Sequence, residues 1–259
     1  MAQYLHLLSN TGAGLPTDVW MPSSNNIKTL YVDHFSAGLF RNFHNNGIET
    51  SVEIYYKNIN NASDFKDGAD IIFNEHLESQ VLTGKGRSYG LELFVKKKYG
   101  RLQGWISYSL SRSENKIAGI SNNKWYAVRH DKTHDVSLVT ILNISKRFSA
   151  SAVWIYTSGN AVTFPSGMYM LDNNPVPYYT ERNGYRMPAY HRMDLSLTLK
   201  GKERKRFESA WDLSFYNLYN RHNAYMISFE ESETVPGATE AVKLSLFGIV
   251  PSLSYKFKF

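Results

Sequence analysis

The stretch SYGLELFVKKKYGRLQGWISYSLSRSE, residues 88–114, contains two long alternating segments on either side of a short turn. In the first segment Tyr89, Leu91, Leu93 and Val95 share one phase, and polar residues such as Glu92 take the other phase. A period of two places apolar side chains on one face of a β-strand and polar side chains on the opposite face. The stretch therefore predicts an antiparallel hairpin of two half-apolar strands.

The same period recurs along most of the chain. It predicts ten strands, at about 1–8, 31–42, 47–58, 86–99, 101–113, 132–146, 148–158, 189–200, 206–217 and 244–259. The segment AYMISFE, residues 224–230, also alternates and extends the last hairpin. No stretch of ten or more residues has a helical period, so the expected fold class is all-β.

The predicted connections alternate in length. FHNNG, YGR, SKRF and GKERKR are short turns. The connections at about 9–30, 59–85, 114–131 and 159–188 are long and contain Gly, Pro, Asn and Asp. In an antiparallel sheet this alternation places all short turns at one end of the strands and all long loops at the other end.

Strand length favours a membrane sheet over a soluble one. A strand that crosses a bilayer needs about 9–11 residues, whereas strands of soluble domains most often have about five or six. The predicted strands reach the spanning length, and aromatic residues stand near strand ends: Tyr89, Tyr99, Tyr108, Trp154 and Tyr156. Such rings form girdles at the two headgroup levels. We expect an antiparallel transmembrane β-barrel segment of about ten long strands, with short periplasmic turns and long extracellular loops.

Two other classes of protein stay open at this point. One is a soluble β-sheet module that binds glycans through its aromatic side chains. The other is a small passive outer-membrane porin. Recovery of a folded monomer from the soluble fraction without detergent would favour the first of these over a membrane protein.

Composition excludes several kinds of site. The 259 residues include no cysteine, so disulfides, thiolate metal sites and cysteine nucleophiles are absent. The net charge is +6, but the basic clusters at 96–101, 146–147 and 200–206 fall in turns rather than along one face, so no nucleic-acid partner is expected. No nucleophile elbow or phosphate loop is present, and neither an enzyme nor a cofactor is expected.

The segment RHDKTHD, residues 129–135, raises the question of a metal site. In an extended chain, His130 and His134 lie about 13 Å apart, because each residue adds about 3.3 Å. That separation is too large for two ligands of one zinc ion. We therefore predict no metal site there and interpret the segment as a polar junction between a loop and a strand.

An ordered set of segments resembles the C-terminal barrel half of TonB-dependent outer-membrane receptors. The segments are LPTDVWMPSSNNIK, SVEIYYK, GKGRSYGLELFVKKKYGRLQGWISYSLSRSE, HDKTHDVSL, TSGNAVTFP, RNGYRMPAYHRMDLSL, FYNLYNRHNAY and SLFGIVPSLSYKFKF. The resemblance implies a 22-stranded barrel in the outer membrane of a Gram-negative bacterium, plugged by an N-terminal domain and driven by a TonB-type protein. It implies active uptake of a scarce solute such as an iron chelate, cobalamin or an oligosaccharide. We expect residues 1–259 to be the C-terminal part of such a barrel, without the plug domain and the first barrel strands.

Side chains of the long loops are candidates for solute contact. Aromatic rings and arginines grip sugars and anionic chelates by stacking and by forked hydrogen bonds. The candidates are Trp125, Tyr126, Arg129, Tyr179, Arg182, Tyr185 and Arg186. Charged residues of the polar phase are instead expected to line a wet lumen, as every strand of a large barrel requires: Glu49, Glu53, Glu92, Arg192, Asp194 and Asp212.

The chain ends in PSLSYKFKF, which alternates strictly. Leu253, Tyr255, Phe257 and Phe259 take one phase and are expected to face lipid, with lysines facing the lumen. The resemblance implies that these four residues form a C-terminal assembly signal, with Phe259 read by the barrel-assembly machinery.

Overall fold

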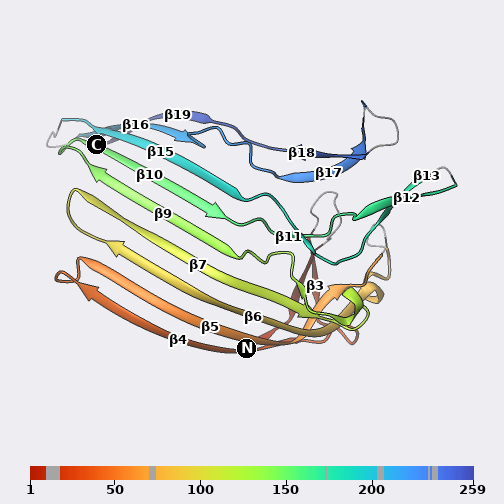
Figure 1. Cartoon of the computed structure of the whole chain (residues 1–259). Coiled ribbons are helices and arrows are strands. Elements are labelled where there is room, and N and C mark those ends of the chain that lie inside the picture. Colours follow the sequence, from red (N-terminus) through yellow and green to blue (C-terminus); the bar gives the residue numbers. More distant parts are fainter. Residues whose placement is uncertain (10–17, 70–73, 173, 203–206, 233, 235–238) are drawn as a thin grey trace.

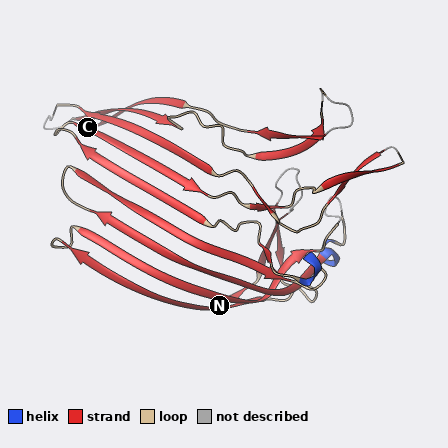
Figure 2. Ribbon diagram, in the orientation of Figure 1, coloured by secondary structure: helices blue, strands red, loops and turns tan. Residues whose placement is uncertain are grey.

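The computed structural model describes residues 1–9, 18–69, 74–172, 174–202, 207–232, 234 and 239–259. These residues form strands β1 to β19 and two short 3-10 helices, η1 (Leu77–Gln80) and η2 (Ser121–Asn123). Within the described ranges no helix is long and apolar enough to cross a membrane. The all-β prediction is confirmed (Figure 2).

One large antiparallel sheet dominates the molecule (Figure 1). Its strands occur in the order β1, β4, β5, β6, β7, β9, β10, β15, β16 and β19, with β8 paired to the far end of β7. Their bounds are Ala2–Gln3, Leu30–Phe43, Ile48–Phe65, Val81–Lys97, Leu102–Lys116, His134–Asn143, Phe148–Thr157, Tyr190–Lys200, Glu208–Tyr216 and Val250–Lys258, and β8 is Tyr126–Ala127. Apart from β1, each strand on this path has nine residues or more, as a spanning strand requires.

Four small hairpins lie beyond one end of this sheet. They pair β2 (Leu5–Ser9) with β3 (Asp18–Pro22), β11 (Ala161–Val162) with β14 (Tyr185–Arg186), β12 (Gly167–Leu171) with β13 (Asn174–Tyr178), and β17 (Met226–Glu231) with β18 (Thr239–Leu244). The short turns lie at the opposite end, at the left of Figure 1. The β4–β5 turn has His44, Asn45 and Asn46 at positive φ, which Asn tolerates better than most residues. The predicted separation of short turns from long loops is confirmed.

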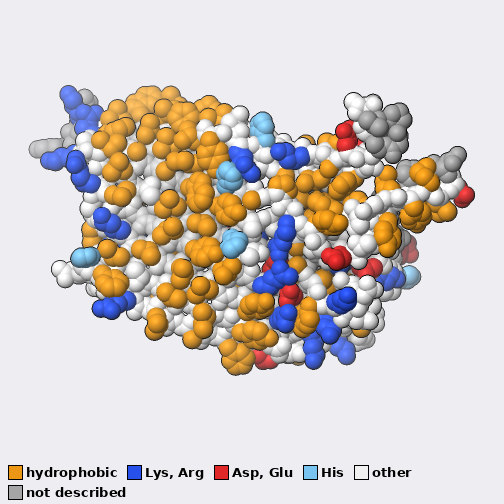
Figure 3. Space-filling view, viewed as in Figure 1, with side chains coloured by type: hydrophobic (Ala, Val, Ile, Leu, Met, Phe, Trp, Pro, Cys, Tyr) orange, Lys and Arg blue, Asp and Glu red, His pale blue; other side chains and the backbone are white. Residues whose placement is uncertain are grey.

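The strand register aligns all apolar phases on one face. Leu39 lies opposite Val52, which lies opposite Leu93, and the row continues through Tyr108 and Val136. The other phase aligns as well. Glu53 lies opposite Glu92, Glu92 lies opposite Ser109, and Ser109 lies opposite Asp135. Figure 3 shows the apolar face, with hydrophobic side chains spread over the whole sheet. The sheet is thus apolar on one side and polar on the other.

The buried core lies under the long loops and not on the sheet. One cluster consists of Leu8, Met21, Ile27, Phe65 and Val81. A second consists of Ile117, Ile120 and Tyr126, with Leu82 packed against it. Side chains in the middle of the large sheet are exposed or half-buried, including Val52 and Ile54. An exposed apolar surface of this extent marks a face that contacts lipid or another protein.

Several predicted boundaries were wrong. The segment 1–8 is not one wall strand, because β2 leaves the sheet to bury Leu8 in the core under the loops. The segment 244–259 is interrupted between β18 and β19, where the Asn217 and Asn220 side chains bond the backbone of Phe247 and Ile249. β5 and β6 extend past the predicted ends, so their connection spans only 66–80. The part of the GKERKR turn at 203–206 lies outside the described residues.

Candidate functional site

Arg182 joins two of the long loops. Its guanidinium donates to the carboxylate of Asp64 at 2.7 Å, to the carbonyl of Phe65 at 3.1 Å and to Asp67 at 3.3 Å. Asp64 also accepts a hydrogen bond from the Tyr126 hydroxyl at 2.9 Å. The Arg182 side chain is only 7% exposed and that of Asp64 13%, so this pair is almost dry, whereas Asp67 is 55% exposed. The network fixes the 159–188 loop against the end of β5 and the loop that follows β7.

Burial sets the ionisation of this network. Burial raises the pKa of the Asp64 carboxyl, and the nearby Arg182 guanidinium opposes that rise. Burial and the Asp64 charge together raise the pKa of the Tyr126 phenol well above its usual range. Tyr126 therefore stays a neutral donor, and Asp64 depends on Arg182 to remain charged.

A second ion pair fixes the same loop at another point. Arg186 bonds the carboxylate of Asp131, the Asp131 carbonyl at 2.6 Å and the Gly159 carbonyl at 3.3 Å. The fully buried Asp131 carboxylate also accepts the Ser113 backbone N–H at 2.6 Å. The β11–β14 hairpin is thus anchored to the end of β7.

Asn183 completes the packing of this loop. Its side-chain amide donates to the Ala127 carbonyl at 2.8 Å, and its backbone N–H donates to the Thr163 hydroxyl at 2.9 Å. Asn183 adopts φ 52°, a left-handed conformation that Asn tolerates better than most residues. Residues 182, 183 and 186 therefore attach this part of the loop to its neighbours, and it forms a fixed platform rather than a free loop tip.

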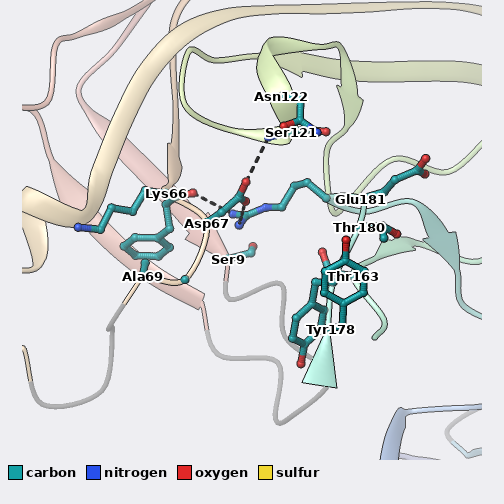
Figure 4. Close-up of a pocket in the computed structure, with 14 residues that line it drawn as sticks. Ser9, Lys66, Asp67, Ala69, Ser121, Asn122, Thr163, Tyr178, Thr180 and Glu181 are labelled. Atoms are coloured by element: carbon teal, nitrogen blue, oxygen red, sulfur yellow. Dashed lines mark hydrogen bonds and ion pairs between the residues drawn. The ribbon is translucent and has the colours of Figure 1, made fainter. Parts of the chain in front are cut away.

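A cavity of about 700 Å³ opens beside this platform (Figure 4). Tyr178, Tyr179, Thr180 and Glu181 line one side of it. The other sides come from the segment 65–69, from η2 and from Ser9. Exposed aromatic rings beside hydroxyl and carboxylate groups suit a polar solute that offers both a flat apolar surface and hydrogen-bonding groups.

The structure separates the predicted loop residues into two sets. Tyr126, Arg182 and Arg186 are used in loop packing, although Arg182 also borders the cavity. Tyr179 lines the cavity with an exposed ring, and Tyr185 is exposed and packs on Phe164 at a ring distance of 5.9 Å.

Trp125 and Arg129 do not line this cavity. The Trp125 ring is covered by the Arg87 guanidinium at 4.3 Å. Arg129 borders a second cavity of about 420 Å³ together with Lys132 and Tyr190, and burial lowers its pKa. The seven predicted residues therefore belong to one end of the molecule but not to one site.

Composition-based reasoning missed four residues of the cavity and its supports. Tyr178 and Lys66 line the cavity, and Asp64 and Asp131 hold the arginines beside it. Tyr178 could have been found from the sequence, because it is adjacent to the predicted residue Tyr179 and is also aromatic. The sequence did not pair the two aspartates with their arginines, because these partners lie 118 and 55 residues away.

Two histidines belong to an aromatic belt at the loop end of the apolar face. His134 accepts or donates a hydrogen bond with the Tyr108 hydroxyl at 2.9 Å, and His191 does so with Tyr219 at 2.8 Å. The Tyr156 ring stacks on His191 at 6.3 Å. In the described part of the chain, no three His, Asp or Glu side chains are arranged to hold a metal ion.

The last strand forms one edge of the sheet. β19 pairs with β16, and Leu253, Tyr255 and Phe257 align with the apolar face. The Phe259 side chain is 87% exposed and its ring lies 5.3 Å from Phe257 and 5.8 Å from Phe207. Within the described residues, the outer edge of β19 has no strand partner, and neither has most of β4.

Two solved structures that resemble this chain are described as receptors. The chain resembles the ferric-catecholate import receptor Fiu from E. coli K12 with a TM-score of 0.56 and 14% identity, over 97% of this chain and 30% of Fiu. It resembles the ferripyoverdine receptor of the outer membrane of Pseudomonas aeruginosa with a TM-score of 0.55 and 11% identity, over 76% of this chain and 24% of that receptor. At these identities the likeness concerns the fold alone.

Sequence comparison assigns the family. No curated protein matches the chain. The family model described as TonB dependent receptor-like, beta-barrel, matches residues 7–220, which is most of the chain. The matched region includes the sheet from β4 to β16 and the loops that build the cavity. The chain therefore belongs to the family of TonB-dependent receptor β-barrels.

Proposed function

We propose that this chain is part of an outer-membrane receptor that takes up a scarce solute by active transport, with energy from a TonB-type protein. The supporting observation is a cavity built by long loops at one end of a sheet that has one apolar and one polar face. A loop-end cavity can capture a solute, and the polar face can line its passage. The solute is an iron chelate, cobalamin or an oligosaccharide, and the chain itself has no catalytic role.

We also propose that residues 1–259 are the C-terminal part of the barrel. The chain spans 30% and 24% of the two similar receptors, and its sheet has free edges at β4 and β19 among the described strands. Unpaired edges are not stable in hydrocarbon, because their backbone groups have no hydrogen-bond partners there. Further strands and a plug domain, which contacts the TonB-type protein, complete the transporter.

Bacterial growth on a limiting supply of the candidate solute tests the transport function. A strain in which this receptor is the route for a candidate solute should grow on that solute only when the TonB-type protein is present. The change Tyr178→Ala with Tyr179→Ala should weaken uptake, because both rings border the cavity. Tyr169→Ala is a matched control, since its exposed ring lies on β12 and is not among the cavity-lining residues. Unchanged uptake in the double variant would show that the solute does not bind in this cavity on its way through the receptor.

Membrane extraction tests the location. The apolar face of the sheet exposes many large side chains, including Leu39 and Ile54, which a bilayer would cover. The complete receptor should therefore be recovered from membranes only with detergent. A folded monomer in the soluble fraction would favour the soluble glycan-binding module instead, and solute entry without the TonB-type protein would favour a passive porin.

The last strand is proposed to carry the assembly signal. The exposed Phe259 ring and the free edge of β19 are accessible to the barrel-assembly machinery. Replacing Phe259 with aspartate should lower the amount of assembled receptor in the membrane. An unchanged level would count against a signal in Leu253, Tyr255, Phe257 and Phe259.

A further inference from the structure

A second cavity lies at the loop end of the polar face. It has a volume of about 420 Å³, which is within the usual range of small-molecule sites. Thr157 of β10 lines it, and the register places Thr157 opposite Asp135 and Tyr190 on the polar face. Among the residues that the structure describes, it shares no lining residue with the cavity beside Arg182. We call it the second cavity.

Two cations line the second cavity. Arg129 and Lys132 belong to the segment between β8 and β9, and both are half-buried. No Asp or Glu is found among the described lining residues. The Lys132 ammonium forms no hydrogen bond or ion pair with any described residue, Asp135 included. The described wall of the cavity therefore has a positive charge that no carboxylate of that wall neutralises.

The segment that carries both cations is fixed by the loop end. The fully buried Asp131 carboxylate, between them in the sequence, is bonded by Arg186. The Ser111 hydroxyl donates to the Lys132 carbonyl at 2.9 Å. The backbone between Arg129 and Lys132 is therefore held in place before any ligand binds, which lowers the entropy cost of binding.

Burial leaves the Arg129 guanidinium short of stabilisation. Burial lowers its pKa, and the negative charge of Asp18 opposes this only in part. A cation that has lost water is stabilised by an anion beside it, and more strongly than it would be at an exposed surface. An anionic ligand therefore suits the second cavity better than a neutral ligand or a cation.

The rest of the second cavity is largely apolar. Its apolar lining includes Val162, Phe164, Met187, Met226 and Ile227. The Phe164 ring lies 5.1 Å from the Phe229 ring, so β17 is packed against the segment that follows β11. Aromatic and thioether side chains cover flat apolar groups well. A bare inorganic anion would use the charges but leave this surface without a partner.

We propose that the second cavity binds an organic anion with an apolar body, such as an aromatic carboxylate. The Lys132 ammonium and the Arg129 guanidinium bind the anionic group. Phe164, Met187 and Met226 cover the apolar body. The inference goes beyond the proposed function, because this site is separate from the cavity beside Arg182 and binding at equilibrium needs no TonB-type protein.

Equilibrium binding to the purified complete receptor tests this inference. The probes are 2-naphthoate, which has an apolar body and a carboxylate, 2-naphthamide, which has the same body without the charge, and acetate, which has the charge without the body. Each is titrated calorimetrically into receptor in uncharged micelles, and the same titration into empty micelles is subtracted. 2-Naphthoate should bind about tenfold or more tightly than either other probe, because charge-assisted hydrogen bonds are stronger than neutral ones.

Three variants and a matched control locate the site. K132Q and R129Q each remove one cation, and each should reduce the preference for 2-naphthoate over 2-naphthamide about fivefold or more. Ala224→Phe leaves both cations in place but fills the cavity that Ala224 lines, and should weaken binding of both naphthyl probes. The control K116Q/K124Q removes two exposed cations of the loop end that do not line the cavity, and should keep the preference.

Each contrary outcome overturns the inference. Equal affinity for 2-naphthoate and 2-naphthamide in the folded receptor would show an apolar pocket without an anion site. Acetate bound as tightly as 2-naphthoate would show an anion site without an apolar one. A preference that survives K132Q and R129Q, or that the K116Q/K124Q control also loses, would place the anion elsewhere. None of these results bears on uptake, which growth with and without the TonB-type protein measures separately.

Discussion

The sheet wall and the loop end are stabilised by different interactions. In the wall, each strand bonds the next through a continuous ladder, and side chains alternate between an apolar and a polar face. At the loop end, buried hydrophobic clusters and ion pairs such as Asp64–Arg182 connect segments that are distant in sequence. The wall is organised for contact with its surroundings, whereas the loop end has an interior of its own. Substitutions should therefore act by different rules in the two regions.

The largest effect should come from breaking the loop-end ion pair. Arg182→Ala leaves the Asp64 carboxylate buried without its cation, and removal of one partner of a buried pair costs about 3–5 kcal/mol. The unfolding free energy of the loop end should fall by that order, as followed by hydrogen exchange of the 159–188 region.

Arg112→Ala is the matched control for this change. Its guanidinium is 42% exposed, and its partner Glu114 keeps a second bond from Arg87. This variant should cost less than about 1 kcal/mol, as exposed pairs do. Equal losses in the two variants would show that the loop end has no special dependence on its buried pair.

In the sheet wall, the free energy cost of introducing a charged side chain should depend on which face of the sheet carries it. Val52→Lys places an ammonium on the apolar face, where a charge at the bilayer midplane costs about 2–4 kcal/mol. Ser51→Lys places the same group one residue away on the polar face, and should be nearly neutral. Folding of the complete receptor into lipid vesicles measures both. Equal destabilisation would mean that the two faces do not have different surroundings.

A glycine on the polar face should tolerate substitution poorly. A Cβ at Gly90 would lie 2.7 Å from the Leu110 carbonyl and 2.9 Å from the Tyr55 ring. Gly90→Ala should therefore cost about 1–3 kcal/mol through overpacking. Gly167→Ala meets nothing within 4 Å and should cost little in the same unfolding assay. If Gly90→Ala were neutral, the ring of Tyr55 would have to move freely.

The smallest effect should be a pH dependence at the loop end. Burial pushes the pKa of Glu114 upward, but hydrogen bonds from Arg87 and Arg112 more than offset this, so the pKa lies below its ordinary value. A lowered carboxyl pKa contributes stability above the pKa of the unfolded chain, and this stability is lost as pH falls through the folded pKa. Wild type should therefore be more stable than Glu114→Gln at about pH 6, and the difference should shrink towards about pH 3. A difference that grows in acid would contradict this assignment.

The wall was predictable from sequence because its pattern is local. The segment 88–114 alternates with a period of two, and the predicted strands 86–99 and 101–113 became β6 and β7, although β6 begins five residues earlier and β7 ends three residues later than predicted. The segment 1–8 was also predicted as a wall strand, but its sequence does not state where its apolar side chains are buried. Leu8 packs with Ile27 and Phe65 under the loops, so tertiary packing overrode the wall assignment.

The loop end was predictable only in composition. Aromatic richness identified Tyr179, which lines the cavity. The same reasoning selected Arg182 as a solute contact, although most of its hydrogen bonds go to Asp64, Asp67 and the backbone of the β5 end. An arginine available for solute and an arginine occupied by a buried carboxylate look identical in a single sequence. The difference depends on pairing across more than a hundred residues.

An accessibility scan along β5 tests the central account most directly, that one face of this sheet contacts lipid and the other does not. Each residue from Thr50 to Tyr56 is replaced in turn by cysteine in the complete receptor, in a background without other cysteines, and labelled with a nitroxide in lipid bilayers. Collision with oxygen, which concentrates in hydrocarbon, should peak at 52, 54 and 56. Collision with a water-soluble nickel complex should be greater at 51, 53 and 55. Accessibility without this alternation, or nickel contact at both sets of positions, would contradict the account.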